Sequence, residues 1–384
     1  MEAYFDNSAT TRCSKGAVEI MVRALSEDYG NPSSLHGKGM EGEHYIKEAA
    51  GKIAKTMKVK EAELIFTSGG TESNNLAILG AAMANRRSGM HLITTCVEHP
   101  AVSAPVKFLE EQGFSVTRLG VDQDGRISLE ELREAITPET ILVSMMYVNN
   151  EIGAVEPVAE AAGIIKAQNP KTLFHVDAIQ AYGKYIIHPA KLGIDMMSVS
   201  GHKIHGPKGS GFLYVRERTK IKPILYGGGQ QRAMRSGTEN VPGIAGLGQA
   251  AGEAYENFEE KQEHLRQLKN VFIEGIADEK WAHINGRKGA DSAPHIISLS
   301  VDGVRGEVLL HALEEQHIYV SAGSACSSNK PAVSATLSAI GVERQYLDST
   351  VRISFCNDNT LEEVAYCVNK LKELVPMLRK YIRH

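Results

Sequence analysis

The stretch from Glu63 to about Val215 constrains the fold of this chain most strongly, because short β-rich runs alternate there with helix-like runs. Such alternation predicts βαβ units and a mainly parallel sheet. Most of the β-rich runs are almost continuously apolar, which indicates strands buried on both faces. Helices are expected between them, for example over Glu72–Asn85, Ala101–Gln112 and Ser128–Ala135. The strand candidates are Leu64–Thr67, His91–Thr95, Ser115–Leu119, Ile141–Val148, Leu173–Val176, Ile194–Val199 and Gly211–Val215.

The C-terminal third of the chain has a different pattern. A long polar helix around Gly246–Glu274 is expected to connect two domains, and strands are expected near Ile296–Val301 and Thr350–Ser354. We therefore expect a large α/β domain and a smaller α+β domain. The predicted bounds are 14–257 for the large domain, and 1–13 with 258–384 for the small one.

Composition excludes several classes of protein. The 384 residues include 42 basic and 46 acidic side chains, so no basic footprint for nucleic acid is present. The start of the sequence does not resemble a signal peptide, and the longest strongly apolar stretch is far shorter than the ~18 residues of a membrane span. The cysteines show neither a CxxC pair nor a zinc-ligand spacing, which predicts a cytoplasmic protein with reduced thiols and no metal site. These cysteines are Cys13, Cys96, Cys326, Cys356 and Cys367.

The segment Thr67–Ser73 ends a predicted strand and opens a helix, which is where open parallel sheets bind ligands. Gly69 and Gly70 allow close backbone approach, and the helix start with Thr71 offers amide and hydroxyl donors to an anion. Ser and Thr are also common helix caps, so this segment alone fits an ordinary helix start as well.

Two further segments follow predicted strands. Asp177 ends an apolar strand, where a partly buried carboxylate needs a cationic or hydrogen-bonding partner. Lys203 lies within Ser200–Gly209, among glycines and hydroxyl and imidazole donors, where a desolvated lysine would be nucleophilic. Taken alone, Lys203 fits a lysine on a surface turn better.

Together these segments match the three contacts of pyridoxal phosphate. The phosphate would lie at the helix start, Asp177 would keep the pyridine nitrogen protonated, and Lys203 would form the covalent link. His99 follows the strand at His91–Thr95 and would lie on the ring face. A single histidine is more often structural, so a role for His99 is predicted only because the other three contacts are present.

Motifs along nearly the whole chain also occur in the order of a known family. They are Phe5–Thr11, Gly30–His36, Gly69–Glu72, Asn149–Gly153, His175–Gln180, Ser200–Gly209, Arg235–Asn240, Ser321–Ser328 and Arg352. In these motifs the chain resembles the NifS/IscS-type cysteine desulfurases, which are fold-type I, class V aminotransferase-like enzymes. The resemblance implies a large domain with a mainly parallel seven-stranded sheet and a smaller α+β domain. The chain departs from the family at Gln231 and Ala233, where Glu and Gly are frequent.

The resemblance implies a role for each matching residue. Lys203 would hold the cofactor, Gln180 would bond the ring hydroxyl, and His99 would stack on the ring and assist proton transfer. Thr238 would reach the phosphate of a neighbouring subunit, which implies a homodimer. The implied cofactor-binding set is Gly70, Thr71, His99, Asp177, Gln180, Ser200, His202, Lys203 and Thr238. The implied substrate-binding residues are Asn150 and Arg352, the latter by a two-pronged contact with the substrate carboxylate.

Cys326 lies in a run of small and polar residues with no apolar anchor, which predicts an exposed loop rather than a buried thiol. As a thiolate it could attack a sulfur atom. The resemblance implies that Cys326 takes sulfur from L-cysteine as a persulfide, releases L-alanine, and passes the sulfur to an acceptor protein. An iron–sulfur scaffold and a tRNA- or cofactor-thiolation protein are both compatible acceptors.

Three alternatives remain at the level of the sequence. Selenocysteine lyase activity would use the same site. A pyridoxal-phosphate aminotransferase would share Asp177 and Lys203 but has no use for Cys326. An inactive scaffold for sulfur-carrier proteins would not need the complete set of expected catalytic residues.

Overall fold

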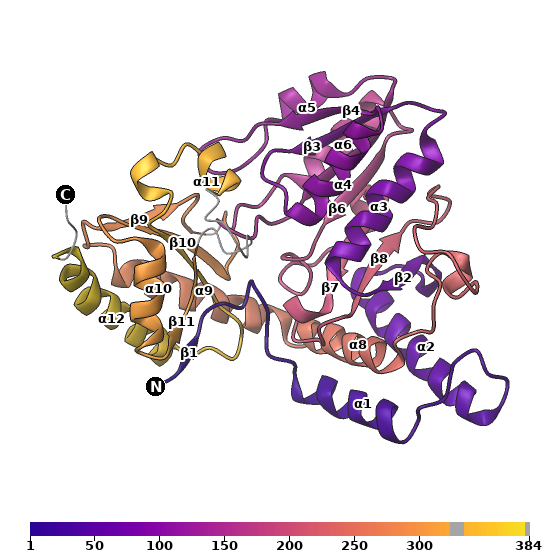
Figure 1. Ribbon diagram of the computed structural model, residues 1–384, viewed down its shortest axis with the longest axis horizontal. Helices are drawn as coiled ribbons and strands as arrows, with labels where there is room; N and C mark the ends of the chain where they lie inside the picture. Colours follow the sequence, from indigo (N-terminus) through magenta and orange to yellow (C-terminus); the bar gives the residue numbers. More distant parts are fainter. Residues whose placement is uncertain (290, 323–333, 381–384) are drawn as a thin grey trace.

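A central seven-stranded sheet dominates the computed structural model, which describes residues 1–289, 291–322 and 334–380 (Figure 1). The strand order is β2-β8-β7-β6-β5-β3-β4. β8 runs antiparallel to both its neighbours and the remaining adjacent pairs are parallel, which confirms the predicted sheet. The strands are β2 (Leu64–Thr67), β3 (His91–Thr95), β4 (Ser115–Leu119), β5 (Thr140–Met146), β6 (Leu173–Asp177), β7 (Met196–Ser200) and β8 (Gly211–Val215).

The apolar strands are buried on both faces, as the sequence predicts. Every residue of β5 and β7 is buried, whereas β4 at the sheet edge is largely exposed or half-buried. Successive strand residues point to opposite faces, so Ile65 packs with helices α3 and α4 while Phe66 packs with α2, α5, α6 and α8. Helices therefore cover both faces of the sheet.

The helices of this region begin and end as follows: α1 (Lys15–Ser26), α2 (Gly37–Met57), α3 (Gly70–Asn85), α4 (Pro100–Glu111), α5 (Leu129–Ala135), α6 (Val158–Gln168), α7 (Pro189–Leu192) and α8 (Val241–Tyr255). In the described part of the chain, no helix combines the length and apolar character required to cross a bilayer.

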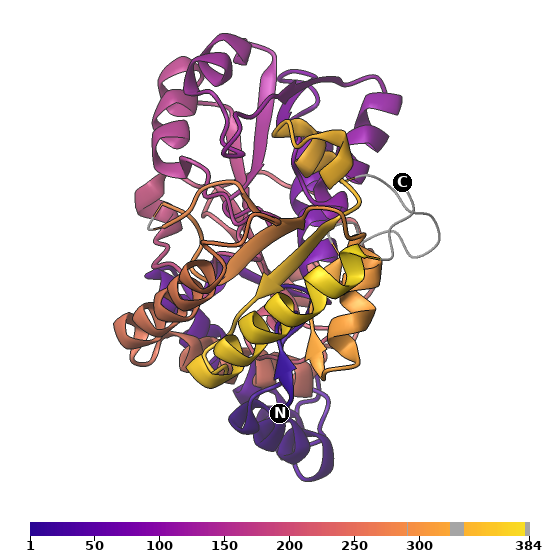
Figure 2. The same ribbon diagram turned by 90° about the vertical axis from the view of Figure 1, so that its left-hand side faces the viewer.

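A second hydrophobic core forms around a four-stranded antiparallel sheet of order β12-β13-β10-β9. The first strand of the chain joins this region, because β1 pairs with β11 and Phe5 packs into the second core. In Figure 2, α9 and α12 lie across one face of this sheet. The predicted domain bounds stay a prediction. The elements are β1 (Ala3–Tyr4), α9 (Phe258–Gly275), β9 (Ala282–Asn285), β10 (Ile296–Val301), α10 (Gly306–Glu314), β11 (Ile318–Tyr319), β12 (Ser321–Ala322), α11 (Ala335–Ala339), β13 (Thr350–Ser354) and α12 (Leu361–Arg379).

The prediction of one long polar helix around Gly246–Glu274 is wrong. Two helices, α8 and α9, occupy this stretch, and Asn257 between them has a left-handed backbone with φ of 49°. α8 is largely buried rather than polar. Its small residues pack against α2 so closely that a Cβ on Gly248 would lie 2.5 Å from the Cα of Ala49. Glycine suits this contact because it lacks a Cβ.

Side chains of the 231–233 turn cover part of the free edge of β2. The Gln231 side chain accepts from Phe66 N at 2.6 Å and donates to Phe66 O at 2.8 Å, so it pairs as a neighbouring strand would. Arg232 donates to the carbonyl oxygens of Ala62 and Leu64. A glutamate at position 231 could accept but not donate, so the departure at Gln231 has a structural use.

Candidate active site

The carboxyl ends of β2, β3, β5, β6 and β7 meet along one edge of the central sheet, where an open α/β fold binds its ligands. A cavity of about 560 Å³ opens at this edge and is also lined by residues of the second core region. It brings together sequence-predicted residues that lie far apart in the chain. These are Gly70, Thr71, His99, Asn150, Asp177, Gln180, Ser200, His202, Lys203 and Arg352.

Asp177 is the last residue of β6 and is buried in the floor of the cavity. One carboxylate oxygen accepts from Ile179 N at 3.0 Å, and the other accepts from the Asn74 side chain at 2.7 Å. Burial raises the pKa of Asp177, which these hydrogen bonds and the nearby His99 and Lys203 oppose. A cationic ring nitrogen would therefore be a favourable partner for this carboxylate.

Lys203 follows β7 at the end of a single 3₁₀ turn, Gly201–Lys203. Its amine donates to the carbonyl oxygens of Ser8 at 2.5 Å and Ala9 at 2.7 Å. The carbonyl of Ser8 also accepts from the Gln180 side chain at 3.0 Å. The N-terminal segment thus positions both side chains at the cavity wall.

The start of α3 lines the cavity together with Ser200 and His202, and the free backbone amides of a helix start can bind an anion. A Cβ on Gly70 would lie 2.2 Å from Ile179 Cδ1, so glycine here avoids a contact that would displace the Ile179 side chain. His202 pairs with the hydroxyl of Thr10 at 3.2 Å. Burial, and then the charge of Lys203, lowers the pKa of His202 to about 4, so this ring is neutral at physiological pH.

His99 caps α4 at the side of the cavity next to Asp177. Its Nδ1 accepts from Ala101 N at 3.0 Å, which places the proton of the neutral ring on Nε2. Burial lowers the pKa of His99; the charge of Asp177 opposes this shift, and the charge of Lys203 adds to it. The neutral form is therefore favoured, with an N–H available to the cavity.

Arg352 lies in β13 on the opposite wall and is buried. It donates to Asn150 O at 2.9 Å and to the Asp6 carboxylate at 2.9 Å. Its Nε is buried and has no partner among the described residues. A carboxylate bound here would satisfy that donor, and the planar guanidinium suits a two-pronged contact.

Cys326 lies outside the described residues. The described residues on either side of its segment do line the cavity: Ser321 and Ala322 before it, and Ser334 after it. Ser334 donates to the Glu151 carboxylate at 2.5 Å, also at the cavity wall. Among the other cysteines, Cys356 and Cys367 are buried, and Cys96 directly follows β3.

Thr238 is exposed and does not line the cavity of this chain. It belongs to the segment that leads from the 231–233 turn to α8. Its predicted contact is with the phosphate of a neighbouring subunit, so a position at the surface is compatible with that prediction.

Comparison with known proteins identifies the family. Residues 3–367 match the family described as aminotransferase class V. The chain is 44% identical over 376 residues to the cysteine desulfurase IscS of Methanosarcina thermophila, covering 98% of this chain and 92% of that protein. It is 43% identical to the putative cysteine desulfurase IscS 1 of Bacillus subtilis, covering 98% and 99%. The chain belongs to the cysteine desulfurase branch of class V aminotransferases.

Solved structures agree with this assignment. A NifS-like protein superposes with a TM-score of 0.93 at 39% identity, covering 98% of this chain and 100% of that one. SspA in complex with cysteine superposes with a TM-score of 0.82 at 35% identity, covering 93% and 100%. The expected family, fold class and dependence on pyridoxal phosphate are confirmed.

Several residues in or next to the cavity of this cysteine desulfurase were not predicted from the sequence. Asn74 holds Asp177, Asp6 holds Arg352, and the carbonyl of Ser8 receives Lys203. Glu98 is buried beside His99, and one of its carboxyl oxygens accepts from Thr95 Oγ1 and Met146 N. Asn74 lies one turn into the helix that opens with the predicted phosphate segment.

Proposed function

We propose that this protein removes sulfur from L-cysteine, giving L-alanine and a persulfide on Cys326. The observation that carries the proposal is that both ends of the Cys326 segment line the cavity that holds Lys203 and Arg352. Four chain steps separate Ala322 from Cys326, and four extended steps reach at most about 14 Å. The length of chain therefore allows the thiol to reach a substrate bound in the cavity.

The residues of the cavity fit pyridoxal phosphate. Asp177 is a buried carboxylate with two neutral donors and room for a cationic partner. Gly70 and Thr71 at the start of α3 line the cavity, and the backbone amides of a helix start can bind phosphate. Lys203 would hold the cofactor, Asp177 its ring nitrogen, Gln180 its hydroxyl and His99 its ring face. Thr71, Ser200 and His202 would hold its phosphate.

Arg352 would orient the substrate. Its guanidinium binds the cysteine carboxylate, and its links to Asp6 and Asn150 O fix its direction. The solved complex of the related SspA with cysteine supports this class of substrate. A lysine could not make the same planar contact.

Lys203 and His99 would handle the protons. When bound, pyridoxal phosphate withdraws electrons from the substrate Cα and makes its proton acidic. The Lys203 amine accepts that proton. His99, neutral and protonated at Nε2, assists proton transfer on the ring face.

Cys326 would accept the sulfur. Its thiolate attacks the substrate sulfur, an S–S bond forms, and the bond between that sulfur and the substrate Cβ breaks. The three-carbon product takes up protons and leaves as L-alanine. The persulfide then transfers its outer sulfur to an acceptor thiol.

A homodimer would complete the site. Thr238 is exposed. The apolar side chains of Tyr29, Leu35 and Tyr226 are also exposed, and all four residues belong to the predicted large domain, residues 14–257. We infer that Thr238 of one subunit reaches the phosphate bound by the other. Iron–sulfur cluster assembly or thiolation in the cytoplasm remains the predicted use of the sulfur.

The decisive assay supplies L-cysteine, a thiol reductant and no 2-oxo acid. The proposal predicts equal amounts of alanine and sulfide. An aminotransferase would need a 2-oxo acid, and an inactive scaffold would form no alanine. Selenocysteine lyase activity would be indicated if selenocysteine turned over and cysteine did not, and that result would overturn the proposal.

A further inference from the structure

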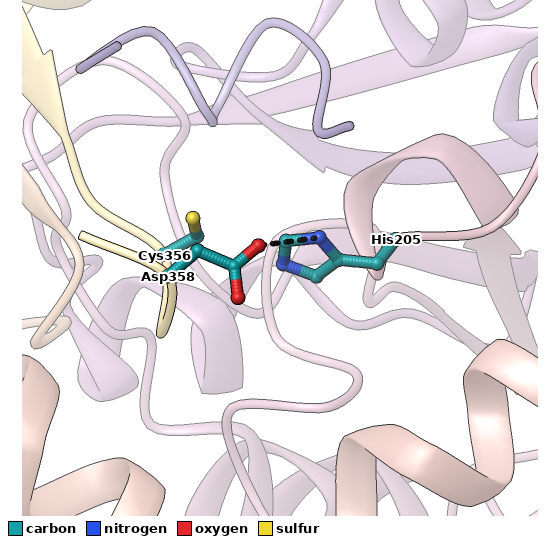
Figure 3. A group of neighbouring side chains, drawn as sticks. All are labelled: His205, Cys356 and Asp358. Atoms are coloured by element: carbon teal, nitrogen blue, oxygen red, sulfur yellow. Dashed lines mark ion pairs between the residues drawn. The ribbon is translucent and has the colours of Figure 1, made fainter. Parts of the chain in front are cut away.

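A cluster of three side chains lies beside the active site and has no part in the proposed reaction. His205 follows Lys203 by two residues, and Cys356 and Asp358 follow the strand that carries Arg352. Each of the three offers one potential metal-ligand atom, and these atoms lie within 4.8 Å of one another. In Figure 3 the Asp358 carboxylate faces the His205 ring.

We propose that His205, Cys356 and Asp358 bind a thiophilic divalent metal ion of the Zn²⁺ class. Imidazole, thiolate and carboxylate are the ligands that zinc takes in proteins, and three protein ligands leave a fourth position for water. The spacing of cysteines in the sequence did not indicate this site, because His205 and Cys356 lie in distant parts of the chain.

The His205 ring is held in the orientation that a metal ligand needs. Its Nδ1 donates to the carbonyl oxygen of Arg12 at 2.9 Å, which leaves the lone pair on Nε2. Metal-binding histidines commonly donate their second ring N–H to a backbone carbonyl in this way. The backbone of His205 is fixed as well, since its N–H donates to Thr11 Oγ1 and its carbonyl accepts from Ser14 N.

The other two proposed ligands, Cys356 and Asp358, differ in how freely their side chains can move. Cys356 is buried, whereas the Asp358 side chain is 78% exposed. Zinc bonds of about 2.0–2.3 Å place ligand atoms about 3.3–3.8 Å apart, so ligand atoms that lie within 4.8 Å of one another need a modest contraction. Rotation of the exposed Asp358 side chain supplies part of this contraction and also leaves a route for the ion from solvent.

The positive charge of Lys184 disfavours a cation bound between His205, Cys356 and Asp358. Its buried amine donates to Lys203 O at 2.7 Å, and its charge acts on both His205 and Cys356. The thiolate and carboxylate together balance the two charges of the ion, so the site can form beside Lys184. Removal of that lysine charge should therefore strengthen metal binding.

A bound ion would link the two walls of the cavity. His205 belongs to the segment of Lys203, and Cys356 belongs to the segment of Arg352. The metal would therefore brace the cofactor-holding lysine against the substrate-holding arginine.

The test measures Zn²⁺ affinity of the holoenzyme by competition with a chromophoric chelator, in a Cys326→Ala background that removes the loop thiol. We expect one Zn²⁺ per chain. His205→Asn and Asp358→Asn should each weaken binding at least about 10-fold, the loss typical even of outer-shell changes. Co²⁺ should give a thiolate-to-metal absorbance band that disappears in Cys356→Ser.

Cys367→Ser is the matched control, because that buried thiol lies in the second core and should not alter binding. Lys184→Met should tighten binding. The exposed Asp358→Asn change keeps the test valid if Cys356→Ser does not fold. Absence of stoichiometric binding, or binding that survives both His205→Asn and Asp358→Asn, would overturn the proposal without affecting the desulfurase assay.

Discussion

The two walls of the cavity are built in different ways. The proposed cofactor side, with Gly70, Asp177 and Lys203, comes from strand ends of one sheet. The proposed carboxylate side joins opposite ends of the chain, because Arg352 donates to Asp6, which lies 346 positions away. The cofactor side is therefore fixed by the sheet itself, whereas the carboxylate side depends on how the second core region packs against it.

This difference explains what the sequence could reveal. Parallel strands end at one edge, so apolar runs followed by Gly70, Asp177 and Lys203 could be assigned to one site from their order along the chain. The partners Asp6 and Asn74 could not, because their contacts depend on register and helix rotation. The resemblance to a family supplied the role of Arg352, but not what holds it.

One helix was predicted wrongly from the sequence. Residues 246–274 carry many charges in their second half, which suggested one exposed connector. The break at Asn257 and the burial of α8 follow from close packing against α2, which a one-dimensional pattern does not record. The departure at Gln231 is similarly explained only by its hydrogen bonds to the edge of β2.

Replacement of Lys203, on the cofactor side, should reduce activity more than any other change considered. Lys203→Ala removes the amine that we propose links the cofactor and moves the Cα proton, and activity should fall about 10²–10⁴-fold. The absorbance band of the lysine-linked cofactor should be lost. Lys208→Ala, an exposed lysine in the same glycine-rich segment, is the control. An unchanged spectrum in Lys203→Ala would exclude this role.

Replacement of Arg352 by lysine tests the carboxylate side, because it keeps the positive charge and removes the planar guanidinium. Arg352→Lys loses the planar contact, and hydrogen bonds to charged groups are worth about 1.5–3 kcal/mol. We expect kcat/KM for cysteine to fall about 10- to 100-fold with the cofactor spectrum unchanged. Arg379→Lys, in a surface ion pair with Asp302, should have little effect. Loss of the cofactor in Arg352→Lys would show that the two sides are not separable.

Acid should weaken the sheet beneath the cofactor side. His175 is buried between Ser144 and Ser198, and burial lowers its pKa to about 3 from the ordinary 6.5. The unfolded chain therefore binds a proton that the folded chain does not, and stability falls as pH decreases from 6.5 toward 3.

The expected loss from His175 is up to about 1.4 kcal/mol per pH unit. Urea unfolding between pH 6.5 and pH 5 measures it at constant cofactor loading. In His175→Gln the free energy of unfolding should depend less steeply on pH, by the equivalent of about one proton taken up on unfolding, even if the variant is less stable throughout. An equal slope in both proteins would show that His175 does not contribute.

The smallest expected effect lies outside both walls, at the turn that covers β2. Ala233 has a left-handed backbone with φ of 59°, which costs alanine more than glycine. Ala233→Gly should stabilise the protein by about 0.5–1 kcal/mol without changing KM. Ala104→Gly, at an exposed position of α4, should destabilise by a similar amount. Destabilisation by Ala233→Gly would contradict this account of the turn.

We propose that sulfur passes from cysteine to Cys326. Mass spectrometry of the peptide that carries Cys326, after one turnover with L-cysteine and no reductant, tests this transfer. We expect the added mass of one sulfur atom on Cys326, with one alanine released per site. In Cys326→Ala, cofactor absorbance should persist while sulfide release is lost. A persulfide on another cysteine, or normal turnover by Cys326→Ala, would contradict the claim.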